Sequence, residues 1–193
     1  KKSSKLTVLF KKLLNSKINI YDIGAGQRIL PEIINFDGVS KIHLVDPNKN
    51  INYSYDQLKN YFSDHKNIFK FQIGISDKTR TQKYYESKIS TASTFALNSK
   101  KSKKYSNYYN LKPIKQTVYS FKDFLKLYKL SKPDAIKIDV EGLELKVIDS
   151  ILRCSDPFLI QIEVNINNPI FNESFSAINR IMMKKNYFLY TLF

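Results

Sequence analysis

Several residue types are scarce in this chain of 193 residues, and each scarcity narrows the class of protein. The single cysteine, Cys154, excludes an internal disulfide framework and suits a reducing compartment. No apolar run approaches the roughly 18 residues that a membrane-spanning helix needs. We therefore expect a soluble, cytoplasmic protein with no membrane span.

Acidic residues are also few, because 17 Asp and Glu side chains face 32 Lys and Arg side chains and leave a net charge of +15. Such a charge can indicate nucleic-acid binding, since clustered basic side chains neutralise phosphates. The excess is mostly lysine, and Asn, Ile, Tyr and Phe are plentiful too, as an AT-rich genome would produce without a functional cause. We favour this compositional explanation, and we interpret the densest basic segment, residues 100–105, as a solvated loop.

Glycine is scarce enough for its positions to be informative. There are five glycines, and four of them fall at or just beyond the ends of predicted strands, namely Gly24, Gly26, Gly74 and Gly142. In open α/β sheets, ligands bind outside the carboxyl ends of the strands, where glycine lets the main chain approach the ligand. Any one of these glycines could serve a turn alone, but four coincidences favour a binding site at this edge.

Strands and helices alternate along the chain, which predicts an α/β fold with a mostly parallel sheet. The predicted strands are residues 18–23, 41–46, 68–73, 134–140, 158–164 and 187–193, and the predicted helices are 5–15, 27–36, 55–62, 121–128, 143–153 and 175–185. Between 78 and 115 the sequence becomes polar, with one short predicted strand at 82–85. We predict a single domain over 1–193, with an N-terminal helix within 1–16 and with 78–115 as an insertion over the active-site mouth.

The first two strand ends predict the cofactor. Residues 22–26 read DIGAG, which lacks the third glycine of a dinucleotide fingerprint and so offers a poor cradle for a pyrophosphate. Asp46 ends the second strand about 20 residues later, the spacing at which an acidic side chain accepts the hydroxyls of an adenosine ribose. Ribose recognition without a pyrophosphate cradle favours S-adenosylmethionine, although a strand-ending aspartate is also a common turn residue.

The third strand end, QIGISD at residues 72–77, should lie beside the first two. This arrangement would place Ile75 against an adenine face and Ser76 or Asp77 near its edge, while Ser76 and Asp77 could equally form an ordinary turn. The predicted cofactor-binding residues are Asp22, Gly24, Ala25, Gly26, Asp46, Pro47, Gly74, Ile75 and Ser76.

The most specific segment is IKIDVEGLEL at residues 136–145. Lys137, Asp139 and Glu141 alternate onto one face of a strand that is otherwise as apolar as a buried one. Glu163 lies in a similar alternation on the next strand, so polar groups would gather at the carboxyl end if these strands are neighbours. A buried Lys137–Glu163 ion pair that fixes the strand register explains those two residues equally well. Asp139 and Glu141, nearest the strand end, are predicted to be functional.

Four segments resemble successive motifs of the FkbM family of methyltransferases: DIGAG at 22–26, VDPN at 45–48, GISD at 74–77 and IKIDVEGLE at 136–144. The resemblance spans roughly residues 18 to 190, and residues 90–94 (STAST) lie where the family often has a hydroxyl-rich patch. It implies a Rossmann-like class I methyltransferase fold, with sheet order near 3-2-1-4-5 plus a C-terminal edge strand and helices on both faces. It also implies S-adenosylmethionine as donor and O-methylation of a hydroxyl on a sugar, glycan or small metabolite.

Methyl transfer to oxygen requires that the acceptor be held beside the methyl group and lose its proton. We predict that Asp139 or Glu141 is the catalytic base, because His43 lies in the middle of a strand and His65 in a polar turn. Both histidines are interpreted as core or surface residues.

Three alternatives stay open. A metal-dependent variant would use Asp139, Glu141, Glu163 and Asn165 as oxygen ligands for Mg²⁺ or Ca²⁺, and it is not favoured. An RNA or DNA methyltransferase would account for the net charge, but the fourth core strand is followed by Val-Glu-Gly where a base amino-methylase would have an Asn-Pro-Pro-Tyr-like turn. A catalytically inactive scaffold would keep the fold and bind a partner.

Overall fold

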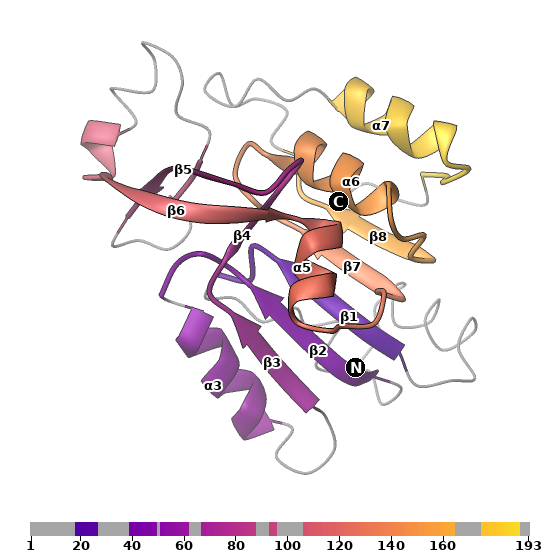
Figure 1. The fold of residues 1–193 in the computed structure, drawn as a ribbon, viewed down its shortest axis with the longest axis horizontal. Helices are drawn as coiled ribbons and strands as arrows, with labels where there is room; N and C mark the ends of the chain where they lie inside the picture. The colour runs from indigo at the N-terminus through magenta and orange to yellow at the C-terminus, as the bar shows by residue number, and fades with distance from the viewer. Residues whose placement is uncertain are drawn as a thin grey trace, which may run out of the picture.

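A five-stranded parallel sheet forms the centre of the molecule (Figure 1). The computed structural model describes residues 18–26, 39–49, 51–61, 67–87, 93–95, 106–164 and 175–189. The strand order is β3-β2-β1-β7-β8, and all four pairings are parallel. This order confirms the predicted α/β fold and the 3-2-1-4-5 arrangement. The strands are β1 (Ile18–Ile23), β2 (Val39–Val45), β3 (Asn67–Phe71), β7 (Ala135–Ile138) and β8 (Leu159–Ile162).

Alternate residues of β1 face opposite sides of the sheet, and each side has its own apolar core. Ile18 and Ile20 pack on one side with Ile51 and Leu58 of helix α3 (Ile51–Tyr61). Tyr21 and Ile23 pack on the other side with the buried residues of helices α5 (Phe121–Leu127) and α6 (Glu144–Leu152). The sheet is therefore covered on both faces.

Helices α5, α6 and α7 begin close to the residues that the hydrophobic periodicity predicted. Ser120 accepts a hydrogen bond from the backbone N–H of Asp123 and caps α5, whose Phe121 and Phe124 are fully buried. Helix α7 (Phe175–Lys184) packs on α6 and buries Ile178. Because α6 follows β7 after a short turn, its first residues lie at the carboxyl end of the sheet.

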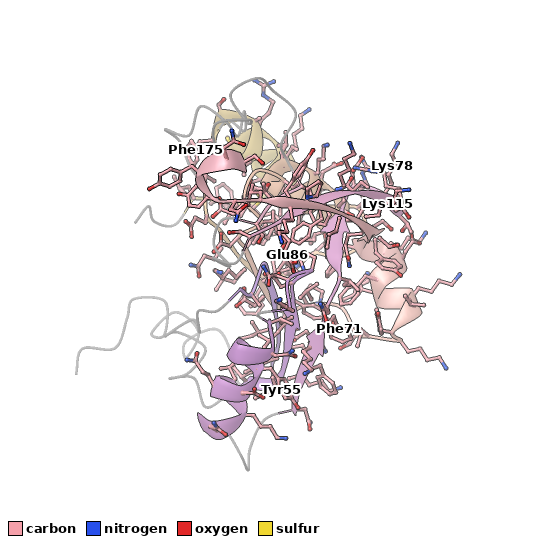
Figure 2. All side chains as sticks on the ribbon, turned by 90° about the vertical axis from the view of Figure 1, so that its left-hand side faces the viewer. Tyr55, Phe71, Lys78, Glu86, Lys115 and Phe175 are labelled. Carbon is pink, nitrogen blue, oxygen red and sulfur yellow. The ribbon has the colours of Figure 1, made fainter. Side chains whose placement is uncertain are left out.

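A second, three-stranded sheet lies across the carboxyl end of the parallel sheet (Figure 1), in the order β4-β6-β5. It consists of β4 (Gly74–Ser76), β5 (Arg80–Glu86) and β6 (Lys112–Ser120). Figure 2 shows Lys78 and Lys115 at this sheet, far from Tyr55 on α3. The segment 78–115, for which one short strand was predicted, thus contains β5 and the start of β6.

Parts of the sequence-based prediction lie outside the described residues. These are the N-terminal helix, the helix at 27–36, the basic segment 100–105 and residues 190–193. Residues 187–189, the start of the predicted last strand, are not in a strand. Across the described part of the chain, every helix is too short or too polar to cross a membrane.

Candidate active site

A cavity of about 200 Å³ opens at the carboxyl ends of β1, β2 and β7, below the second sheet. It is the place where the sequence predicted a ligand site, because three parallel strands end there. Nine of the eleven predicted site residues line it, namely Gly24, Ala25, Gly26, Asp46, Pro47, Gly74, Ile75, Asp139 and Glu141.

The turn after β1 is packed too tightly for any side chain at its first glycine. Gly24 has a φ of +82°, and a Cβ there would lie 1.7 Å from the carbonyl oxygen of Asp139. Its N–H donates to the carbonyl of Val45 (2.8 Å), so the turn is held between β2 and β7. Gly26 also has a positive φ of +48°, but a Cβ at this position would meet no atom closer than 3.9 Å. The first glycine is required by packing, and the second leaves open space at the cavity.

Asp46 is fixed by backbone donors on both of its oxygens. Oδ2 accepts from the N–H of Gly26 (2.9 Å), and Oδ1 accepts from the N–H of Asn48 (2.7 Å). Burial raises the pKa of this carboxyl to about 6, while the two backbone donors act in the opposite direction. Each carboxylate oxygen can accept a second hydrogen bond, so Asp46 retains capacity for ligand hydroxyls.

Lys137 bridges two carboxylates, one on β1 and one just after β7. Asp22 and Lys137 are direct neighbours across β1 and β7, and Lys137 Nζ lies 3.4 Å from Asp22 Oδ1 and 3.0 Å from Asp139 Oδ2. Burial alone would lower the pKa of Lys137, but the two carboxylates outweigh it and raise the pKa. The lysine is therefore a cation shared by Asp22 and Asp139, in place of the Glu163 pairing that the sequence left open; Glu163 is exposed.

The turn after β7 holds Glu141 in a backbone conformation that non-glycine residues rarely adopt. Its φ is +52°, and that of Gly142 is +96°. The N–H of Gly142 donates to both carboxylate oxygens of Glu144 (3.0 and 3.1 Å), and the hydroxyl of Thr94 donates to the carbonyl of Glu141 (2.7 Å). Strained residues that the surroundings hold in place concentrate at functional sites.

The Glu141 carboxyl has a pKa suited to proton exchange. Burial raises its pKa to about 7, and the nearby carboxylates of Asp139, Glu144 and Glu163 act in the same direction. A general base works best when its pKa is close to the operating pH. Of the two predicted catalytic residues, Glu141 has this property, whereas Asp139 is engaged by Lys137.

Among the lining residues that were not predicted as site residues, four come from β5 and from residues 93–95: Tyr84, Ser93, Thr94 and Phe95. Tyr84 is buried, with its ring centroid 4.6 Å from that of Phe95. A Cβ on Gly74 would come within 2.8 Å of the Phe95 ring, so the glycine admits the aromatic ring. The hydroxyl-rich stretch at 90–94 was the only sequence signal for this wall.

Asp22 and Ser76, also predicted to bind the cofactor, do not line the cavity. Asp22 is buried behind the wall beside Lys137. The hydroxyl of Ser76 donates to Asp77 (2.9 Å) and accepts from Arg80 (3.3 Å). Both side chains support the site from outside it.

His43 belongs to the core, one of the two placements, core or surface, that the sequence predicted for it. Its ring stacks on Tyr21 (4.1 Å between centroids) and on Phe69 (5.3 Å), and burial lowers its pKa to about 3. His65 and Asn165 lie outside the described residues. Within the ranges that the structure describes, no group of three or more His, Cys, Asp or Glu side chains is arranged to hold a metal ion.

Residues 22–189 match the model of the methyltransferase FkbM domain. No curated protein and no solved structure matches the chain significantly. The matched range runs from the end of β1 to beyond α7 and includes every residue that lines the cavity. The chain therefore belongs to the FkbM family of methyltransferases.

Proposed function

We propose that this methyltransferase uses S-adenosylmethionine and methylates a hydroxyl group on a glycan or a small metabolite. The observation that carries the proposal is the pairing of two carboxylates across one cavity. Asp46 can accept hydrogen bonds from a ribose, and Glu141 can take up a proton near neutral pH. Both lie at the carboxyl edge of a parallel sheet, where such ligands bind.

The residues of the cavity fit this cofactor. Asp46 has unused acceptor capacity at both oxygens, and binding of hydroxyl donors would compensate for its burial. Ile75 and Phe95 supply apolar surface on which an adenine can lie. Among the described residues of the lining, four carboxylates, from Asp46, Asp139, Glu141 and Glu163, face one cation, that of Lys137. This charge balance suits a cationic sulfonium and disfavours an anion.

When bound, the cofactor supplies an electrophilic methyl group on a sulfonium. We infer that Glu141 would accept the proton that the acceptor hydroxyl loses. The methyl group would pass from sulfur to that oxygen, and S-adenosylhomocysteine would remain. Asp139 is held by Lys137 beside the reacting groups. The Gly24 turn is held between β2 and β7, so this part of the cofactor side is fixed in place by its packing.

The same charge distribution bears on the nucleic-acid alternative. The protein carries a net charge of +15, but its cavity has an excess of carboxylates. These carboxylates would repel phosphates next to the reacting hydroxyl. A neutral hydroxyl acceptor therefore fits the cavity better than a nucleotide does.

Calorimetric titration with S-adenosylhomocysteine tests the cofactor assignment. We expect micromolar binding by the wild type and a loss of about tenfold to a hundredfold in Asp46→Asn, because one acceptor of charge-assisted hydrogen bonds is removed. Asp56→Asn, on the exposed side of α3, is the matched control and should bind within twofold of wild type. Absence of binding by the folded wild type would favour the inactive scaffold.

A further inference from the structure

Three consecutive residues, 93–95, each contact a different part of the cavity wall. The hydroxyl of Ser93 accepts from the side-chain amide of Asn48 (2.9 Å), and the hydroxyl of Thr94 donates to the carbonyl of Glu141 (2.7 Å). The ring of Phe95 occupies the space beside Gly74. This segment therefore touches the wall after β2, the wall after β7 and the start of β4.

On the cofactor side, the contacts of Ser93 continue to the carboxylate that we assign to the ribose. Asn48 is buried, with only 1% of it exposed, and its N–H donates to Asp46 Oδ1 (2.7 Å). Ser93 Oγ also accepts from the N–H of Ser87 (2.9 Å). A buried path of hydrogen bonds thus runs from Asp46 through Asn48 to Ser93.

On the acceptor side, Thr94 is attached to the rest of the protein at its backbone and at its hydroxyl. Its N–H and carbonyl exchange hydrogen bonds with Tyr85 of β5 (3.1 and 2.9 Å), and only 1% of the residue is exposed. Its hydroxyl reaches the carbonyl of Glu141, whose φ of +52° is unfavourable for a residue with a side chain. Thr94 therefore helps to hold the turn that directs the Glu141 carboxylate.

We propose that Ser93 and Thr94 are positioning residues that hold the two sides of the cavity, Ser93 through Asn48 for the ribose carboxylate Asp46 and Thr94 for the base Glu141. The inference rests on the proposed function. Neighbouring hydroxyls on one segment then fix the distance between the methyl donor and the base. Misplacement by about 1 Å can cost about a hundredfold in rate, so such a connection has a direct catalytic consequence.

Two probes separate the roles of the two hydroxyls. S-adenosylhomocysteine has no group at the position of the transferred methyl, whereas sinefungin has a charged amine there, which attracts the carboxylates on the acceptor side. We expect Thr94→Val to bind S-adenosylhomocysteine within about threefold of wild type and to lose about tenfold of its preference for sinefungin. Ser93→Ala should weaken both probes by about the same factor, again about tenfold.

Matched variants exclude a general effect on folding. Thr81→Val makes the same change at an exposed position of β5 and should alter neither probe. Thr94→Ser keeps the hydroxyl and should restore the preference for sinefungin, while Thr94→Ala replaces Thr94→Val if the valine variant does not fold. Thermal unfolding of each variant supplies the folding control.

The outcomes distinguish this inference from the proposed function. The positioning role of Thr94 would be overturned if Thr94→Val weakened both probes equally or kept the preference for sinefungin, or if Thr94→Ser did not restore that preference. These results would leave the cofactor assignment intact. A folded wild type that binds neither probe would overturn the proposed function and, with it, this inference.

Discussion

The two ends of the cavity hold their carboxylates in different ways. Asp46 is fixed through its side chain, because each carboxylate oxygen accepts a backbone N–H. Glu141 is fixed through its backbone, by Thr94 and by the Gly142–Glu144 hydrogen bonds, and no described residue donates a hydrogen bond to its carboxylate. The difference suits the proposed roles, in which Asp46 binds the ribose and Glu141 exchanges a proton.

Glu141→Gln should have the largest effect of these variants, and the effect should fall on turnover rather than on cofactor binding. Removal of a general base lowers turnover by about a hundredfold to ten-thousandfold. Binding of S-adenosylhomocysteine should stay within about threefold, because the amide preserves the shape of the residue. The measurement is transfer of a radiolabelled methyl group to a panel of glycans and small hydroxyl compounds, with Glu86→Gln on β5 as control. If Glu141→Gln retains full turnover, Asp139 becomes the candidate base.

Lys137→Met should have the next largest effect, because it removes the cation shared by Asp22 and Asp139. Asp22 is buried and would lose its partner, so we expect the free energy of unfolding to fall by about 3 to 5 kcal/mol. Urea denaturation measures this loss. Arg153→Met breaks the exposed Arg153–Asp149 pair, and it should cost less than about 1 kcal/mol. Similar losses in the two variants would contradict a stabilising role for the buried pair.

The pH dependence of turnover, set by Glu141, should differ from that of cofactor binding, set by Asp46. The ionised form of Glu141 is the base, so turnover should rise about tenfold per pH unit up to a pH of about 7 and then level off. The affinity for S-adenosylhomocysteine should fall only below a pH of about 6, where Asp46 becomes protonated. Turnover and binding profiles measured from pH 5 to 9 test both limbs. A single shared pH midpoint would contradict the separation of roles.

The parts of the site that the sequence predicted lie where polar residues interrupt apolar strands. Gly24, Asp46 and Asp139 stand out at the ends of β1, β2 and β7 for this reason, and the alternation of strand residues placed them on the cavity side. Ser76 does not line the cavity, although Gly74 and Ile75 do, and its hydroxyl is engaged by Asp77 and Arg80.

The second sheet was harder to predict, because its strands give little hydrophobic signal. Only Tyr84 of β5 and Val118 of β6 are buried, and the two strands pair across a long intervening segment. Thr94 and Ser93 act through contacts that are distant in sequence, and the pairing of Asp22 with Lys137 depends on strand register. Local patterns do not encode such contacts.

His43→Phe should have the smallest effect and should separate pH effects on the cavity from acid unfolding. The pKa of His43 is lowered to about 3 in the folded protein, so the unfolded chain takes up a proton first as the pH falls through 6.5. The wild type therefore loses stability between pH 6.5 and 3, and phenylalanine, which can keep the stacking on Tyr21, removes this loss. Relative to its value at pH 8, the stability difference in favour of His43→Phe should reach about 1 kcal/mol at pH 5.5. Urea denaturation at the two pH values measures it, and an unchanged difference would show that His43 takes up its proton without unfolding. If His43 is protonated in the folded protein, its charge could also lower the affinity for S-adenosylhomocysteine below pH 6. The affinity of the wild type and of His43→Phe would then be compared before the decline is assigned to Asp46.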